Sequence, residues 1–163
     1  MWLAVIEEVR CHYTCAVRIA LGSDHAGLEL KNLLVAHLGN KGHELFDLGA
    51  HSPESVDYPD FGEAVGRFVA AGDADFGVCC CGTGIGISIA ANKINGVRAA
   101  VVHDLTTAHL AREHNDANVI CFGSRVIGVL VAIEALDAFL SATFAGERHA
   151  QRVAKIQRLE EAQ

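Results

Sequence analysis

Short apolar segments alternate with longer amphipathic segments along most of the chain, and this alternation limits the possible folds more than any other feature. The apolar segments lie at residues 17–21, 43–48, 76–80, 97–102 and 119–122. Runs of this length that stop at glycine or at polar residues are typical of buried strands in a parallel sheet. The sequence therefore predicts five strands.

The segments between these strands carry apolar residues every three or four positions, which is the spacing of one helix face. Helices are expected at residues 28–38, from about 57, from about 87, and at 105–114, 126–140 and 147–162. Gly42 and Pro59 stand where helices are expected to end and to begin. Five alternations of strand and helix with short connections predict a doubly wound α/β domain around a five-stranded parallel sheet.

The length and the first residues bear on domain organisation and location. A length of 163 residues suits one domain, so residues 17–163 are expected to form a single domain that ends in a helix. Residues 1–16 form an extension of uncertain structure, and they lack the basic start and the cleavage site of a signal peptide. Without export the protein is expected in the cytoplasm, with its 6 cysteines as free thiols.

Charge and hydropathy argue against two kinds of partner. The net charge of −7 does not suit a nucleic-acid surface. The apolar segment 126–140 is interrupted by Gly128, Glu134 and Asp137, so no membrane span is expected. A small anionic ligand remains compatible, because a local group of arginines binds an anion whatever the overall charge.

The candidate site lies in the loops after the predicted strands, because ligands of parallel α/β sheets bind at the carboxyl ends of the strands. These loops lie at residues 22–27, 81–86, 103–104 and 123–125, together with the region around Tyr58. No role is suggested for residues 103–104. The other loops carry polar groups or bare backbone suited to a ligand.

Gly82, Gly84 and Gly86 form a G-x-G-x-G loop between a strand and a helix. The pattern lacks the third glycine of a dinucleotide fingerprint and the Lys-Ser/Thr of a P-loop. A tight turn is the plainer explanation, but one or two glycines usually suffice for it. Three glycines favour a backbone that approaches a ligand closely and offers N–H groups to a phosphate or to an oxyanion.

Three consecutive cysteines precede this loop, and their positions on the strand separate them. Cys79 and Cys81 are expected on one side of the sheet and Cys80 on the other. Three adjacent thiols cannot surround one zinc ion, so no metal site is expected. Cys79 and Cys80 are interpreted as small buried residues. Cys81 lies at the strand end near a helix N-terminus, which lowers a thiol pKa and favours a base or nucleophile, with a core cysteine as the alternative.

Three further polar groups occur at Asp24-His25, at His114-Asn115, and at Arg148 with Arg152. The first pair follows the first strand, and taken by itself it is explained more plainly as a solvated loop. The second pair ends a helix, where histidine as a capping residue and asparagine in a left-handed turn are the plainer explanation. The two arginines share one helix face and are able to hold one phosphate, or they belong to a solvated face.

Six segments together resemble the ribose-5-phosphate isomerase B family, which includes relatives that act on allose and galactose 6-phosphates. They are GSDHAG (22–27), DYPD (57–60), CGTGIGISIAANK (81–93), AREHNDANV (111–119), FGSR (122–125) and GERHAQRV (146–153). The resemblance extends from about residue 17 to about residue 160. It implies a Rossmann-like, three-layer α/β/α domain, a homodimer or dimer of dimers with shared active sites, and catalysis without metal or cofactor.

The resemblance also implies roles for individual residues. Cys81 matches the general base that moves a proton between C2 and C1 of the sugar, and Thr83 matches a residue that helps to pass a proton. His114 matches the residue that opens the sugar ring. Asp24 matches a residue that binds the substrate and is also expected to take part in catalysis. The other positions that match substrate-binding residues are His25, Tyr58, Gly82, Gly84, Ile85, Gly86, Asn115, Arg125, Arg148 and Arg152, the three arginines and His25 toward the phosphate.

The activity implied is the interconversion of D-ribose 5-phosphate and D-ribulose 5-phosphate through an enediolate. Cys81 in C-G-T-G favours the ribose branch, with a hexose 6-phosphate isomerase as the alternative. A non-catalytic sugar-phosphate sensor needs neither Cys81 nor His114. A redox protein needs two thiols at disulfide distance on one face, which successive strand residues do not supply. The extension before Val17 lies outside the family pattern.

Overall fold

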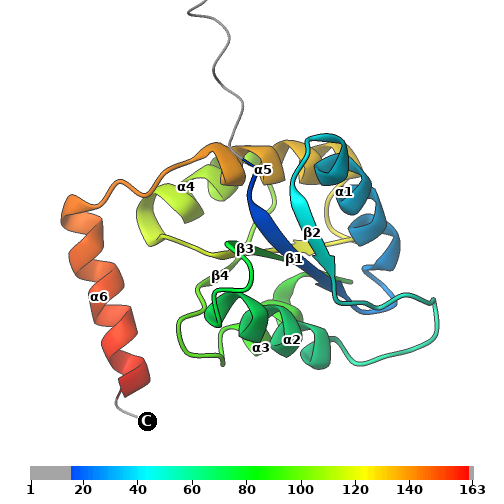
Figure 1. Ribbon diagram of the computed structural model, residues 1–163, viewed down its shortest axis with the longest axis horizontal. Coiled ribbons are helices and arrows are strands. Elements are labelled where there is room, and N and C mark those ends of the chain that lie inside the picture. The colour runs from blue at the N-terminus through cyan, green and yellow to red at the C-terminus, as the bar shows by residue number, and fades with distance from the viewer. Residues whose placement is uncertain (1–15, 162–163) are drawn as a thin grey trace, which may run out of the picture.

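The computed structural model describes residues 16–161, so the extension expected at residues 1–16 lies outside the described residues but for its last one. Strands and helices alternate along the chain, as Figure 1 shows. They are β1 (Arg18–Ser23), α1 (Leu28–Asn40), β2 (Glu44–Asp47), α2 (Tyr58–Ala70), β3 (Phe76–Cys81), α3 (Ile85–Ala91), β4 (Ala99–Val101), α4 (Leu105–Asn115), β5 (Val119–Gly123), α5 (Val129–Ser141) and α6 (Glu147–Glu161).

The strands form one parallel five-stranded sheet in the order β2-β1-β3-β5-β4, which confirms the predicted fold class. β1 and β3 lie side by side at the centre, and β1 leads outward to β2 while β3 leads to the other half of the sheet. Their carboxyl ends therefore flank a point where the connections diverge, which is where ligands of such sheets bind. Ser23 pairs with Cys80 at this point.

Helices cover both faces of the sheet and make a three-layer α/β/α domain. In Figure 1, α1, α4 and α5 lie above the sheet and α2 and α3 lie below it. Cys80 packs in the upper core, while Cys79, Cys81 and Cys121 pack in the lower core. This division confirms that neighbouring cysteines of β3 point to opposite faces. None of these four thiols, which are the cysteines within residues 16–161, is in a disulfide.

Several helix boundaries differ from the prediction for local reasons. α5 begins at Val129 instead of 126, because the amides of Val126 and Ile127 both donate to the Gly123 carbonyl and form a turn first. Gly128 then has an extended conformation as the residue before the helix. α1 continues for two residues beyond the predicted end, and α3 begins two residues earlier than predicted.

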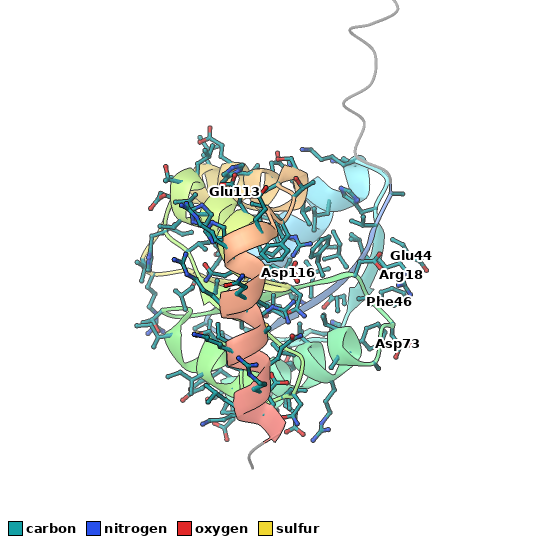
Figure 2. All side chains as sticks on the ribbon, turned by 90° about the vertical axis from the view of Figure 1, so that its left-hand side faces the viewer. Arg18, Glu44, Phe46, Asp73, Glu113 and Asp116 are labelled. Carbon is teal, nitrogen blue, oxygen red and sulfur yellow. The ribbon has the colours of Figure 1, made fainter. Side chains whose placement is uncertain are left out.

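Helix α6 crosses the amino-terminal edge of the sheet, opposite the carboxyl ends of the strands. At its start the Ala145 amide donates to the Glu113 carbonyl at 2.9 Å, which ties it to the end of α4. Near its end, Glu160 Oε2 accepts a hydrogen bond from the Gly96 amide at 3.0 Å, on the side of α3. Figures 1 and 2 show α6 spanning this end of the molecule, with Glu113 near its first turns.

An ion cluster lies at the amino-terminal ends of β1 and β3. Arg18 pairs with Asp75 at 2.8 Å and donates to the carbonyl oxygens of Gly72 and Asp73, which ties the connection after α2 to β1. Figure 2 shows Arg18 with Glu44 and Asp73 on this surface. Among the helices that the structure describes, none is long and apolar enough to cross a membrane.

Candidate active site

Cys81 is the last residue of β3 and lies at the carboxyl edge of the sheet. Its side chain is buried, with 4% of the residue exposed. The Gly84 amide donates a hydrogen bond to Cys81 Sγ at 3.1 Å. Gly84 adopts the left-handed conformation with φ of 78°, which glycine reaches without strain, and this conformation turns the loop back over the sulfur. The sulfur is thus packed inside the chain but in direct contact with a loop amide.

The glycine loop partly satisfies its own amides. Gly84 N–H points at the sulfur, and the Ile85 amide donates to Thr83 Oγ1 at 3.3 Å. Thr83 and Ile85 are exposed, so the loop faces solvent on its outer side. The expectation that the loop amides point outward to a ligand therefore does not hold for Gly84 and Ile85 in this conformation.

Tyr58 and Arg125 flank the loop from two other elements. The Tyr58 ring, at the start of α2, packs so closely on Gly86 that a Cβ there would lie 2.6 Å from two ring carbons. The Arg125 guanidinium lies beside Gly82, and the Arg125 amide donates to the Gly82 carbonyl at 3.1 Å. Both side chains are exposed, so each reaches the same solvent-facing side of the loop.

Asp24 and His25 complete this group from the end of β1. The Asp24 amide donates to the Cys80 carbonyl at 3.3 Å, which fixes Asp24 beside β3. Asp24 is buried, and its Oδ1 accepts a hydrogen bond from the Gly27 amide at 2.8 Å. His25 Nδ1 accepts from the Val56 amide at 3.2 Å and so ties the loop that leads to Tyr58. We call Asp24, His25, Tyr58, residues 81–86 and Arg125 the carboxyl-edge group.

The remaining candidates lie at the other edge of the sheet. α4 starts after the carboxyl end of β4 and runs toward the amino-terminal edge of the sheet, where β5 begins. Its 11 residues span about 16 Å. His114 lies at its far end, five residues before β5 begins at Val119. Arg148 and Arg152 lie on the first turns of α6, which is tied to the same end of α4. One chain therefore does not bring His114, Asn115, Arg148 or Arg152, here called the amino-edge group, to Cys81.

His149 belongs to this amino-edge group, although the sequence analysis did not single it out. Its ring stacks on that of His114, with ring centroids 4.2 Å apart and an angle of 10° between the planes. Arg148 Nε donates to His149 Nε2 at 3.2 Å. Burial lowers the pKa of His149, and the nearby His114 and the two arginines lower it further. His149 and Val153 form the buried stripe of an otherwise exposed helix, which the charged sequence around them did not indicate.

The helix end at His114 differs from the plainer explanation considered for it. Asp116, not Asn115, adopts the left-handed conformation, with φ of 48°. Asn115 is the last helical residue and is exposed. The Asp116 carboxylate instead pairs with Arg98 at 2.8 Å and with Arg112. Asn115 is consequently available to line a hollow.

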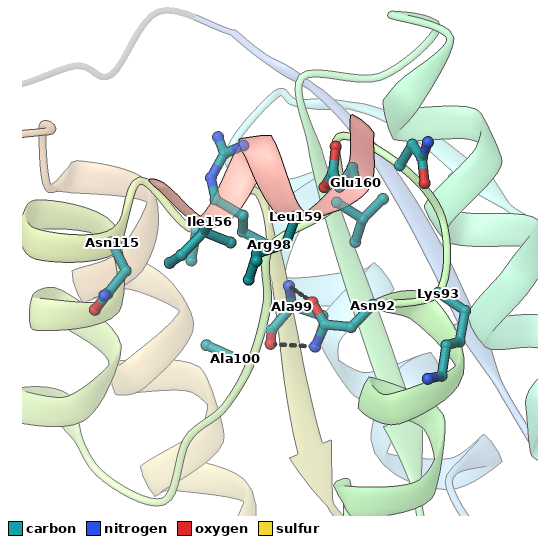
Figure 3. A pocket seen from close by; sticks show the side chains of 12 residues that line it. Asn92, Lys93, Arg98, Ala99, Ala100, Asn115, Ile156, Leu159 and Glu160 are labelled. Carbon is teal, nitrogen blue, oxygen red and sulfur yellow. Dashed lines mark hydrogen bonds between the residues drawn. The ribbon is translucent and has the colours of Figure 1, made fainter. Parts of the chain in front are cut away.

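Asn115 lines a hollow of about 440 Å³ between α6 and the edge strand β4. Lys93, Arg98 and Glu160 also line it, and Figure 3 shows the side chains around it. The Asn92 side chain pairs with both the amide and the carbonyl of Ala99 at 2.8 Å, which covers part of the exposed edge of β4. The hollow contains no residue of the carboxyl-edge group.

The other thiols near Cys81 are buried structural groups. Cys121 lies opposite Cys79 in the paired strands and on the same face, so the sequence argument that no thiol pair shares a face was incomplete. Both residues are completely buried. Burial raises the pKa of Cys121 and that of Cys80, which leaves these thiols protonated. In the part of the chain that the structure describes, no three histidine, cysteine or acidic residues are placed to hold a metal ion.

Comparison with known proteins identifies relatives of the whole fold. Residues 19–156 match the model of the family described as Ribose/Galactose Isomerase. Ribose-5-phosphate isomerase B of Escherichia coli K12 is 49% identical over 144 residues, which cover 88% of this chain and 97% of that protein.

Solved structures agree with these relatives. The structure of ribose-5-phosphate isomerase B from Clostridium thermocellum is 49% identical, has a TM-score of 0.88, and covers 89% of this chain and 98% of its own. The enzyme from Mycoplasma genitalium with bound ribulose-5-phosphate is 43% identical, has a TM-score of 0.86, and covers 90% and 97% of the two chains.

Proposed function

The chain belongs to the ribose/galactose isomerase family, and we propose that it interconverts D-ribose 5-phosphate and D-ribulose 5-phosphate. The observation that supports this most strongly is the contact between Cys81 and its glycine loop. A buried sulfur that accepts a backbone N–H at 3.1 Å, at the divergence of β1 and β3, is suited to carry negative charge next to a ligand. We place this reaction in the pentose phosphate pathway and in the cytoplasm.

Cys81 acts as the base of the isomerisation. With the aldose ring open, the thiolate removes the proton on C2, and the electron pair forms a C1–C2 double bond while the aldehyde oxygen becomes an oxyanion. The thiol then returns the proton to C1, and the hydroxyl proton on O2 moves to O1. C2 thereby becomes the ketone, and no electron acceptor is required.

The glycine loop stabilises the oxyanion, and Thr83 assists the exchange of the hydroxyl proton. Backbone N–H groups aimed at a developing charge lower the barrier most when they are fixed in advance. The Gly84 and Ile85 amides are directed at Cys81 Sγ and Thr83 Oγ1, so the oxyanion is assigned to the amides of Gly82, Thr83 and Gly86. Thr83 is exposed and its Oγ1 accepts the Ile85 amide, which leaves its hydroxyl proton for donation to the substrate.

A second copy of the chain supplies the ring-opening group. His114 lies about 16 Å along α4 from the carboxyl edge where Cys81 is found, so the two residues do not meet in one chain. A two-fold dimer, in which each copy presents the same surface, brings the amino-edge group of one chain to the carboxyl-edge group of the other. The exposed apolar residues of α3 and α6 fit such an interface; they are Ile85, Ile89, Ile156 and Leu159. His114 then opens the furanose ring as an acid and base.

The arginines bind the phosphate. Arg148 and Arg152 are one helical turn apart on α6, where two guanidinium groups are able to hold one phosphate with charge-assisted hydrogen bonds. Arg125 and His25 approach the phosphate from the carboxyl-edge group. A phosphate bound between the two groups fixes the sugar across the subunit boundary, with C1 and C2 toward Cys81.

An isomerase of a hexose 6-phosphate is the second candidate, because the matched family includes galactose isomerases. A coupled assay that compares ribose 5-phosphate, allose 6-phosphate and galactose 6-phosphate distinguishes the two, with a chelator present to test the expectation that no metal is needed. The proposal predicts the highest kcat/KM with ribose 5-phosphate and no loss with the chelator. A higher kcat/KM with either hexose phosphate contradicts it, and no turnover of any substrate favours a sensor.

A further inference from the structure

We propose that His149 is a positioning residue that holds the imidazole of His114 and the guanidinium of Arg148 in one fixed arrangement. The inference rests on the proposed function, because His114 and Arg148 have their roles there. His149 itself is assigned no contact with the sugar. Its effect on the reaction is exerted through the two residues that it touches.

The ring stack is the first observation. The rings of His114 on α4 and His149 on α6 are nearly parallel, with an angle of 10° and a centroid distance of 4.2 Å. The His114 side chain is 38% exposed, whereas only 8% of His149 is exposed. The buried His149 ring therefore packs flat against the more exposed His114 ring and fixes the plane of that ring.

The backbone around the stack is also fixed. The Ala145 amide donates to the Glu113 carbonyl at 2.9 Å, directly before His114 in the chain. The His149 amide donates to the Gly146 carbonyl at 2.8 Å in the first turn of α6. Both histidines are thus held from their main chains, so the stack fixes the remaining freedom of the His114 side chain.

The hydrogen bond from Arg148 is the second observation. Arg148 Nε donates to His149 Nε2 at 3.2 Å, so this nitrogen carries no proton and the neutral ring has its proton on Nδ1. His114 and Glu113 face His149 from α4, and Arg148 and Arg152 face it from α6. A neutral ring in this position accepts from Arg148 and stacks on His114 in either charge state of that residue.

The arrangement connects two ends of the substrate. His114 acts at the sugar ring, and Arg148 acts at the phosphate several bonds away. Acid–base groups act only when they lie within hydrogen-bonding reach of the atom they protonate, and small misplacements reduce rates strongly. A shared contact through His149 keeps the distance between the ring-opening group and the phosphate-binding group constant.

Two variants and two reactions separate positioning from a merely structural role. His149→Ala removes both contacts, whereas His149→Phe keeps an aromatic ring for His114 and removes the acceptor for Arg148. One reaction is the isomerisation of ribose 5-phosphate, which starts from a closed ring. The other is the exchange of deuterium from solvent into C1 of ribulose 5-phosphate, followed by NMR; this ketose cannot form a furanose ring because its O5 carries the phosphate.

The expected results differ between the variants. His149→Ala lowers kcat for ribose 5-phosphate by roughly ten- to a hundredfold, since general acid–base catalysis contributes about 10² to 10⁴ in rate. The same variant keeps the maximal rate of deuterium exchange, which needs Cys81 but no ring opening. His149→Phe restores kcat for ribose 5-phosphate, whereas KM is raised in both variants because Arg148 has lost its acceptor. Thr106→Ala, on the exposed first turn of α4 and far along the helix from His114, is the control and is expected to leave both reactions unchanged.

Other results overturn the inference. Equal losses of isomerisation and exchange in His149→Ala, an unchanged kcat in that variant, or a kcat of His149→Phe as low as that of His149→Ala each refute positioning through the stack. Thermal unfolding of each variant shows whether it is folded, and His149→Phe serves as the test when His149→Ala is not. A wild-type protein without isomerase activity refutes the proposed function instead.

Discussion

Two inactive variants are predicted to restore activity to each other when their subunits are mixed. Cys81→Ala removes the base of the carboxyl-edge group, and His114→Ala removes the ring-opening residue of the amino-edge group. Within one chain the length of α4, about 16 Å, runs from the carboxyl edge of the sheet to His114, so each active site is expected to draw the two residues from different chains. Mixed dimers are then the only species with a complete site.

The size of the recovery follows from the geometry. Random reassociation of equal amounts makes about half of the dimers mixed, and in a two-fold dimer each mixed dimer has one site with both native residues and one with neither. The mixture should therefore reach about one quarter of the wild-type activity per subunit, and purified mixed dimers about one half, by the same symmetry.

The assay uses variants with two different affinity tags, expressed together and purified over both tags, so that only mixed dimers are measured with ribose 5-phosphate. Cys81→Ala mixed with Asp24→Ala is the control. Both of these residues belong to the carboxyl-edge group, so every mixed site lacks one of them and no recovery is expected. Mixed dimers of Cys81→Ala and His114→Ala without activity would show that each site takes both residues from one chain, and would refute the reasoning.

Three further variants test single features. Cys81→Ala should abolish turnover and leave the binding of phosphate nearly unchanged in calorimetry, whereas a parallel loss of both would argue against a base. Gly86→Ala should displace the exposed Tyr58 ring, which lies 2.6 Å from the added Cβ, and raise KM about tenfold. The protein should stay folded, because a ring on the surface is able to move. An unchanged KM would show that Tyr58 does not contact the substrate. The Arg18 guanidinium lowers the pKa of Asp75 below its ordinary value of 3.8. The ion pair therefore stabilises the folded protein above pH 3.8, and this contribution is lost as the pH falls through the lowered pKa. Urea unfolding should show Asp75→Asn less stable than wild type at pH 7, with the difference reduced near pH 3; a constant difference contradicts the linkage.

The fold was largely predictable because its signal is local. Apolar segments that end at glycine mark buried parallel strands, and helical spacing marks the segments between them. The start of α5 was not predictable in this way, since the apolar spacing continues through Val126 and Ile127. Only the hydrogen bonds of these two amides to the Gly123 carbonyl show that they belong to a turn.

The candidate site was predictable where one topological rule applies. The carboxyl-edge group follows from the position of ligands in parallel sheets, and the structure does gather Asp24, Tyr58 and Arg125 around the loop after Cys81. His114 is not covered by this rule, because it ends a helix at the opposite edge. The resemblance implied active sites shared between subunits but not which subunit supplies each residue, and only the course of α4 places His114 away from Cys81 within one chain.

Residues that act through contacts between distant elements were missed. His149 lies in a charged helix that was interpreted as mostly exposed, and only packing against α4 reveals its stack with His114. Cys121 stands alone in its strand, and its place opposite Cys79 depends on the register between β3 and β5. Such contacts depend on the arrangement of elements in space, for which the local pattern carries no signal.

The most direct test of the account is a crystal structure of the assembled protein with ribulose 5-phosphate bound. The account predicts Cys81 Sγ within about 3.5 Å of C1 or C2, a distance suited to proton transfer, with the imidazole of His114 from the second chain at the other side of the sugar. A sugar bound far from the sulfur, or one that contacts His114 of the same chain as Cys81, would contradict it.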